Sequence, residues 1–320
     1  MRVGVFTTVY RDVSLDEAVE RLSALGVGAI ELGTGNWPGD QHCAPAALLG
    51  DAAACAAFRR RIEAHGLTIS ALSQHGNPVH PDAAVAEHDH ATFVDTVRLA
   101  GELEVPVVNG FSGCPGDGPE GRRPNWVTCA WPPEFREILE WQWDERLIPY
   151  WQQQVPLLQQ HGVNMALEMH PGYCVYNPET LERLRRATHP VIGANFDPSH
   201  LFWQGIDPVV AIKSLGPAIY HVHAKDTYID TANVALNGVL DTKPYRRLRE
   251  RSWFFRSVGF GRGEQVWHDI VSALRLVGYD GVVSIEHEDG LMSIDEGLSK
   301  AVELLLRICP TEPPANPWWV

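Results

Sequence analysis

Four successive apolar runs in the second half of the chain end in polar residues. The runs finish in Glu168-Met-His170, Asp197-Pro-Ser-His200, His221-Val-His223-Ala-Lys225 and Glu286-His-Glu288. If each run is a β-strand, alternation places the side chains of Glu168 and His170 on one face. The same holds for His223 and Lys225. Four adjacent strands of this kind would bring three carboxylates and a histidine within ligand distance of one another.

Such a cluster needs a countercharge, because carboxylates repel one another strongly in a partly desolvated site. A divalent cation would supply it. Mixed oxygen and nitrogen ligands without a thiolate pattern favour Mn²⁺, with Mg²⁺, Co²⁺ or Zn²⁺ as alternatives. The six cysteines show no C-x-x-C spacing, which is typical of reduced cysteines in an intracellular protein. We therefore expect one divalent metal ion, with Mn²⁺ foremost.

The elements that position these residues follow from the alternation of short apolar runs with stretches of helical period. Helix 14–26 opens with a capping box formed by Ser14 and Glu17. The predicted strands are 3–8, 29–33, 68–73, 106–111, 164–169, 192–196, 219–224 and 282–286. The other predicted helices are 51–65, 86–103, 144–161, 179–187, 208–215, 265–277 and 294–308. Eight βα units predict an α/β protein with a single (β/α)₈ TIM barrel.

The chain length suits one such barrel. The chain has 320 residues, 45% of them hydrophobic, and shows no linker-like break, so the predicted barrel covers residues 1–309. Long βα connections at about 112–143 and 226–262 belong on the face where barrels build active sites. Residues 310–320 form a tail with four prolines, expected to lie against a surface.

Charge and hydropathy exclude several kinds of partner. The net charge is -14 and the pI is about 5.4, so the average surface repels phosphate backbones and nucleic acid is not expected. The one dense basic run, Arg246, Arg247, Arg249 and Arg251, is interpreted as a solvated face. The sequence has no signal peptide pattern and no membrane span, which makes the cytoplasm the expected location. A homo-oligomer is left open.

The chain resembles the sugar phosphate isomerase/epimerase superfamily of xylose-isomerase-like TIM barrels. The resemblance rests on the 167–171, 196–200 and 221–226 motifs, on the glycine-rich segment 258–263 before Trp267, and on 278–286. It implies that Glu168, Asp197, His223 and Glu286 are the metal ligands. It also implies that His200 contacts the substrate near the metal, which would be a sugar or a sugar-derived carbonyl compound.

The resemblance also suggests the chemistry. In ketose 3-epimerases of this superfamily, two glutamate ligands exchange protons with a carbon beside the carbonyl. Glu168 and Glu286 are therefore the expected catalytic pair. The metal would hold two substrate oxygens and stabilise the enediolate that forms when the proton leaves. The leading prediction is thus a divalent-metal-dependent isomerase or epimerase.

Some residues depart from those epimerases. Ile229 stands where an arginine is expected, and Cys174 stands where a substrate-binding glutamate is expected. The 286–289 segment and Lys225-Asp226 look closer to branches that cleave 3-keto-glycosides and C-glycosides. A 3-keto-glycoside lyase is therefore the alternative. An endonuclease IV-like phosphodiesterase shares the barrel, but it would need a multi-zinc site and a basic groove.

Further residues are predicted to contact the substrate. His170, Lys225 and Glu288 lie at the same strand ends as the ligands. His75 and Asn77, in the segment after 68–73, could donate to or accept from substrate hydroxyls. Asn77 with its neighbouring glycine and proline equally predicts a simple turn, and both interpretations stay open at this point.

Overall fold

Eight parallel strands form a closed barrel, as predicted. In the computed structural model, which describes residues 1–315 and 319, the strands follow the order β1-β10-β7-β6-β5-β4-β3-β2 around the barrel. They are β1 (Arg2–Phe6), β2 (Ala29–Gly33), β3 (Thr68–Ser73), β4 (Val107–Gly110), β5 (Asn164–Glu168), β6 (Ile192–Phe196), β7 (Ile219–Ala224) and β10 (Val282–Ile285). Because β1 pairs with both β2 and β10, the sheet has no free edge.

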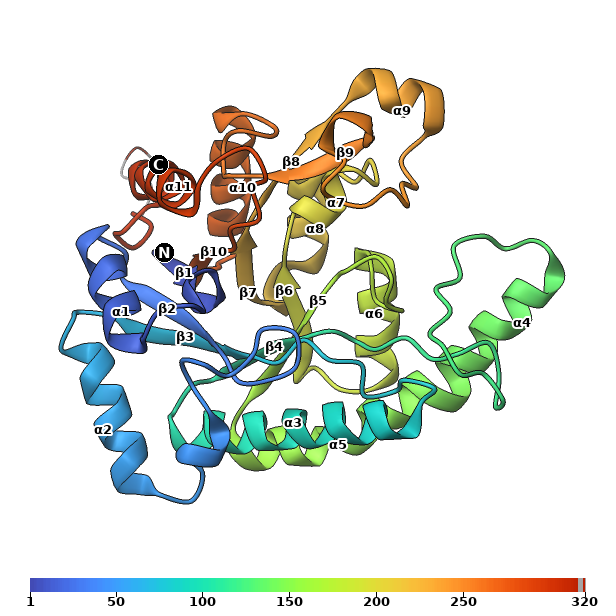
Figure 1. Cartoon of the computed structure of the whole chain (residues 1–320), viewed down its shortest axis with the longest axis horizontal. Coiled ribbons are helices and arrows are strands. Elements are labelled where there is room, and N and C mark those ends of the chain that lie inside the picture. The colour runs from blue at the N-terminus through green and yellow to red at the C-terminus, as the bar shows by residue number, and fades with distance from the viewer. Residues whose placement is uncertain (316–318, 320) are drawn as a thin grey trace.

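One long helix follows each strand and covers the outside of the barrel (Figure 1). These helices are α1 (Leu15–Ala24), α2 (Ala52–Glu63), α3 (Ala83–Glu102), α5 (Ile148–His161), α6 (Pro178–Ala187), α8 (Pro208–Leu215), α10 (Glu264–Leu276) and α11 (Ile294–Ile308). Ser14 caps α1 by accepting a hydrogen bond from the Glu17 backbone N–H, which is the serine half of the predicted capping box, while the Glu17 carboxylate pairs with Arg21.

Most predicted boundaries agree with the structure to within two or three residues. The strands predicted at 29–33, 68–73, 192–196 and 219–224 have the predicted bounds. The first strand ends at Phe6 instead of Thr8, because Thr7–Tyr10 form a short 3₁₀ helix, η1. The helix expected from 144 begins instead at Ile148, after the π-helical turn η3 (Gln142–Leu147).

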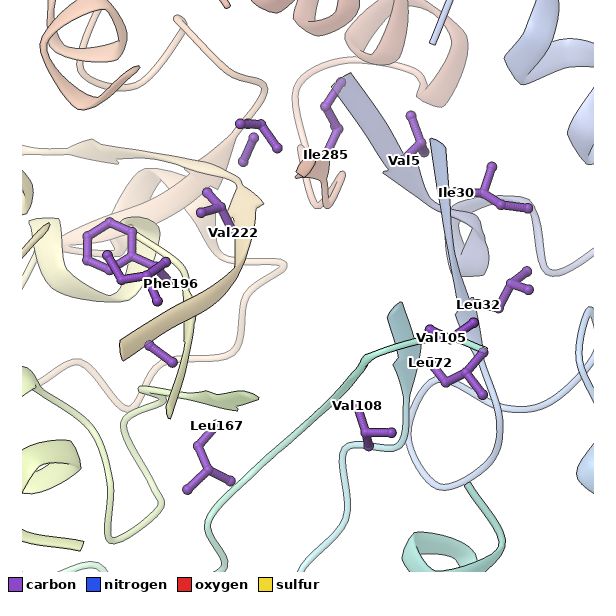
Figure 2. Packing of buried hydrophobic residues seen from close by; sticks show 14 of the residues in the cluster. Val5, Ile30, Leu32, Leu72, Val105, Val108, Leu167, Phe196, Val222 and Ile285 are labelled. Carbon is purple, nitrogen blue, oxygen red and sulfur yellow. The ribbon is translucent and has the colours of Figure 1, made fainter. Parts of the chain in front are cut away.

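Alternation along the strands separates apolar from polar side chains. Val5, Ile30, Leu72, Val222 and Ile285 belong to the large hydrophobic cluster between the strands and the surrounding helices (Figure 2). Their strand neighbours include the buried polar residues Glu31, Ser73, His221, His223 and Ser284. Since successive side chains of a strand point to opposite faces, the apolar set faces the helices and the polar set faces the barrel interior. Apolar packing between strands and helices therefore stabilises the barrel, and the polar side chains that could do chemistry lie in its interior.

Both long connections contain regular structure of their own. The first includes α4 (Pro133–Trp141), which stands apart from the barrel on the right of Figure 1. The second folds into an antiparallel hairpin of β8 (Asp226–Ile229) and β9 (Trp253–Arg256), joined through α9 (Thr231–Asn237). Ile229 pairs with Trp253 in this hairpin. Ile229, which stands where the epimerases are expected to carry an arginine, therefore lies in the inserted hairpin.

Asp226 fixes the glycine-rich segment that follows the hairpin. Its buried carboxylate accepts hydrogen bonds from the backbone N–H groups of Gly259, Gly261 and Arg262 and from Trp267 Nε1, each at 3.0 Å. A Cβ at Gly261 would lie 2.5 Å from Asp226 Oδ1. Glycine is needed here because the chain passes so close to the carboxylate.

Two further features concern the chain as a whole. Within residues 1–315 and 319, no helix has the length and apolar character needed to cross a membrane. The N-terminal amino group donates to the Pro310 carbonyl at 2.8 Å, so the start of the predicted tail packs beside the start of the barrel. Positions 316–318 and 320 of that tail lie outside the described residues.

Candidate active site

The four predicted ligands meet at the carboxyl ends of four neighbouring strands. Glu168 ends β5, Asp197 follows β6, His223 lies near the end of β7, and Glu286 follows β10. One potential ligand atom from each residue lies within 4.8 Å of the others. All four side chains are buried. The barrel therefore brings together residues that are up to 118 positions apart, from 168 to 286.

Glu168 is held by three histidines. His75 Nε2 lies 3.1 Å from its Oε2 and His200 Nε2 lies 3.0 Å from its Oε1, while His223 Nδ1 is 3.3 Å from Oε2. Burial alone would raise the pKa of Glu168, but its close contacts with these three histidines lower it well below the ordinary value. Glu168 is thus ionised at neutral pH, as a ligand or a proton acceptor must be.

Two of the four side chains present buried atoms whose close contacts are with other charged or ionisable groups of the site. Asp197 Oδ2 and His223 Nδ1 are buried and make no hydrogen bond with the described residues. Buried polar atoms of this kind are uncommon in folded proteins. Both belong to the cluster of four, and both are atom types that bind divalent metals. The donor set therefore fits a metal ion.

The charge of the cluster also fits a divalent ion. Lys225 Nζ lies 3.1 Å from Asp197 Oδ2 and 2.7 Å from Glu286 Oε2. Three ligand carboxylates carry -3 and the Lys225 ammonium carries +1, so the sum is -2 with a neutral histidine. A divalent cation would neutralise this charge. Without it, burial disfavours a protonated His223, but Glu31 and Glu286 raise its pKa well above the ordinary value.

Lys225 completes the electrostatics of the site. Its Nζ also lies 3.3 Å from Glu288 Oε2, and it stands over the Phe255 ring at 4.7 Å from the centroid. Burial would lower the pKa of Lys225, but Asp197, Glu286 and Glu288 raise it well above the ordinary value. The residue therefore stays cationic although its side chain is buried.

A cavity of about 870 Å³ opens beside the cluster. Among the four candidate ligands, Glu168 and Glu286 border this cavity, while Asp197 and His223 do not. Much of the remaining wall is apolar and aromatic; it includes Trp37, Phe111, Tyr173, Tyr245, Leu248, Phe255, Met292 and Ile294. Small-molecule sites commonly combine an apolar wall with a few convergent polar groups.

The predicted substrate-binding residues divide into two groups. His75, His170, Lys225 and Glu288 border the cavity. Burial, with the nearby His200, lowers the pKa of His170 to about 3, so its ring is neutral. Because its Nδ1 donates to the Pro171 carbonyl at 2.6 Å, its Nε2 can accept a hydrogen bond from a hydroxyl.

The other two predicted substrate-binding residues do not line the cavity. His200 contacts Glu168 and lies 3.4 Å from Asp197 Oδ2, and it does not border the cavity. The Asn77 amide donates to the Cys114 carbonyl and accepts from the Cys114 N–H, both at 2.9 Å. Both polar groups of Asn77 are thus engaged in holding a loop, in agreement with the turn interpretation.

Several residues of the site carry no clear signal in the sequence. Glu31 in β2 is fully buried and contacts His223 Nε2 at 3.0 Å. Burial would raise the pKa of Glu31, but His223 and His221 lower it. In the sequence, only the presence of one acidic residue within an apolar strand pointed to a role for Glu31. The aromatic wall residues come from separate loops, and only the fold shows that they face one cavity.

Comparison with known proteins agrees with this fold and site. The family model described as "Xylose isomerase-like TIM barrel" matches residues 19–308. The chain therefore belongs to the xylose isomerase-like TIM barrel family, as the sequence motifs predicted. The protein YfiH of Bacillus subtilis (strain 168), described as uncharacterized, is 38% identical over 308 residues, covering 95% of this chain and 98% of YfiH.

Two further proteins indicate the range of reactions among similar proteins. An inosose dehydratase of Geobacillus thermodenitrificans (strain NG80-2) is 26% identical over 162 residues, or 48% of this chain and 50% of that protein. The crystal structure of D-psicose 3-epimerase in the presence of D-fructose matches over 96% of this chain and 99% of that chain, with a TM-score of 0.61 and 15% identity. At 15% identity, the likeness to this epimerase shows that the two chains share a fold and no more.

Proposed function

We propose that this protein is a divalent-metal-dependent sugar isomerase or epimerase that transfers a proton at a carbon beside a carbonyl group. One observation carries the proposal: Glu168 and Glu286 belong to the four-residue cluster and also border the cavity. They can therefore reach a bound substrate from two strands while contributing to a metal site. Such a pair suits removal of a proton on one side and its return from the other.

The remaining polar residues have supporting roles in this proposal. A divalent ion held by Glu168, Asp197, His223 and Glu286 would stabilise negative charge on the substrate oxygens as the proton leaves. Lys225 would donate a hydrogen bond to a substrate oxygen or to Glu286, and His75 and His170 would contact hydroxyl groups. Mn²⁺ as the ion and a cytoplasmic location stay predictions of the sequence, and a homo-oligomer stays open.

A lyase that acts on a 3-keto-glycoside is the second candidate. It would use the same proton removal beside a ketone and then expel the group attached to the neighbouring carbon. The size of the cavity favours it, because about 870 Å³ is near the upper end of the 300–1,000 Å³ that is usual for small-molecule sites. The partial similarity to an inosose dehydratase also supports an elimination. The aromatic wall and the net charge of -14 give no support to the phosphodiesterase alternative.

Glutamine variants in deuterated water test both candidates. Glu168→Gln and Glu286→Gln keep the side-chain size and one oxygen ligand but remove the proton acceptor. Turnover should fall about 10²–10⁴-fold, whereas the exposed Glu140→Gln control should behave as wild type. The wild-type protein with Mn²⁺, assayed on ketoses and keto-glycosides, should place deuterium on the carbon beside the carbonyl. An epimer or isomer as product supports the first candidate, and a released aglycone supports the second.

Metal occupancy distinguishes the role of each residue. Asp197→Ala should lose the metal while the barrel stays folded, because residues at the carboxyl ends of barrel strands serve the site more than stability. The glutamine variants should retain more metal than Asp197→Ala does. Near-normal turnover by Glu286→Gln would refute its proposed role as acid or base.

A further inference from the structure

The Glu31 carboxylate lies in the barrel interior, in contact with the candidate ligand His223. It is fully buried and receives hydrogen bonds from four other strands. Ser73 Oγ donates to Oε1 at 2.5 Å, Asn109 Nδ2 donates to Oε1 at 3.0 Å, and Ser284 Oγ donates to Oε2 at 2.7 Å. His223 Nε2 lies 3.0 Å from Oε1 and 3.1 Å from Oε2.

These contacts determine which nitrogen of His223 carries a proton. The two Glu31 oxygens accept hydrogen bonds from Ser73, Asn109 and Ser284, so the carboxylate acts as an acceptor on every side. His223 Nε2 must therefore be the donor in its contact with Glu31. In a neutral imidazole, the other nitrogen is then unprotonated and can act as a ligand.

The free nitrogen faces the candidate ligands. His223 Nδ1 lies 3.3 Å from Glu168 Oε2 and 3.1 Å from Glu286 Oε2, and it makes no hydrogen bond with the described residues. The Phe6 ring stacks on the imidazole, with the centroids 5.8 Å apart and an interplanar angle of 29°. The ring is thus held by Glu31 at one edge and by Phe6 across its face.

We propose that Glu31 is a positioning residue that fixes the tautomer and orientation of His223 for binding of the metal ion. The inference rests on the metal site of the proposed function, and it adds a residue outside the set of four. A purely structural role accounts less well for a carboxylate at this position, because burying a charge costs free energy that an apolar side chain would not. Carboxylates that accept from the second nitrogen of a ligating histidine raise the basicity of that ligand and orient it.

Metal binding to a matched pair of variants tests the role of Glu31. Glu31→Gln keeps the size of the side chain but removes the charge that holds the His223 N–H. Ser284→Ala removes one hydrogen bond to Glu31 and leaves its contact with His223. Calorimetric titration of the metal-free proteins with Mn²⁺ should give about 10–100-fold weaker binding for Glu31→Gln. Ser284→Ala should bind Mn²⁺ within about 3-fold of wild type, a shift of about 0.65 kcal/mol at most.

Each outcome of the titration is informative. If folded Glu31→Gln binds Mn²⁺ as tightly as wild type, or if both variants lose affinity equally, Glu31 has no positioning role. If the wild-type protein binds no divalent metal ion, the metal site and this inference both fail. Binding by wild type together with unchanged affinity in Glu31→Gln overturns the inference alone, whatever reaction the enzyme catalyses.

A second measurement does not depend on how the variant folds. In ¹⁵N NMR spectra of the wild-type protein loaded with Zn²⁺, which is diamagnetic and does not broaden the signals, the His223 ring should carry its proton on Nε2 and none on Nδ1. A ring protonated on Nδ1 alone would overturn the inference, because the nitrogen beside Glu31 would then not be a donor.

Discussion

Replacing Lys225 by Met should destabilise the metal-free protein more than the metal-loaded protein, because each depends differently on the Lys225 charge. Methionine has a similar length, so the main loss is the ammonium group. Its Nζ contacts Asp197 and Glu286, which are both buried, and Glu288, whose side chain is 34% exposed. Removing one partner of a buried ion pair leaves an uncompensated charge and typically costs about 3–5 kcal/mol. We expect Lys225→Met to lower the free energy of unfolding of the metal-free protein by that amount.

A divalent metal ion should restore much of this stability. The ion would supply the positive charge that Lys225 no longer provides, so the variant should bind Mn²⁺ more tightly than wild type. Free ion at 100 times its dissociation constant adds about 2.7 kcal/mol to the free energy of unfolding. Urea denaturation followed by circular dichroism, with a chelator and with Mn²⁺, measures both quantities.

A matched control is Lys300→Met. Lys300 pairs with Glu296 on the exposed face of α11, and such exposed pairs contribute about 0.2–1 kcal/mol. The control should therefore change stability little, with or without the ion. Equal urea midpoints for Lys225→Met and wild type in the presence of chelator would refute the assigned charge balance. So would a loss of stability in Lys225→Met that Mn²⁺ does not reduce.

Two further predictions concern the inserted hairpin and the segment after it. Gly261→Ala should destabilise the protein by about 1–3 kcal/mol, because the new Cβ would lie 2.5 Å from Asp226 Oδ1 and from the Thr227 carbonyl carbon. The control Gly118→Ala, whose Cβ would have no atom within 4 Å, should leave stability unchanged. Equal thermal midpoints for the two variants would contradict this prediction. Asp241 accepts from the Ser252 N–H at 2.6 Å, and although burial alone would raise its pKa, its hydrogen bonds lower the pKa from 3.8 to about 2. Its contribution should thus be fully present above pH 3.8 and lost as the pH falls to about 2. Hydrogen exchange of the hairpin amides should show this loss in wild type, and an equal pH dependence in Asp241→Asn would count against it.

The sequence by itself predicted the barrel and its candidate ligands for a common physical reason. Strands of a parallel barrel are short and buried, and their side chains alternate with a fixed period, so polar residues that end apolar runs are visible in the sequence. Glu168, Asp197, His223 and Glu286 all occupy such positions. Because the carboxyl ends of the strands lie on one face, four strand ends predict one cluster without knowledge of any loop.

Only the tertiary structure decided which residues surround that cluster. Glu31 is a single acidic residue in an apolar strand, and its contact with His223 joins positions 192 residues apart. Tyr245 and Phe255 face the cavity because residues 226–262 fold into a hairpin, which depends on cross-strand pairing and not on local period. Asn77 is held by Cys114 from a different loop. Contacts of this kind depend on long-range packing, and a sequence pattern of short period carries no information about them.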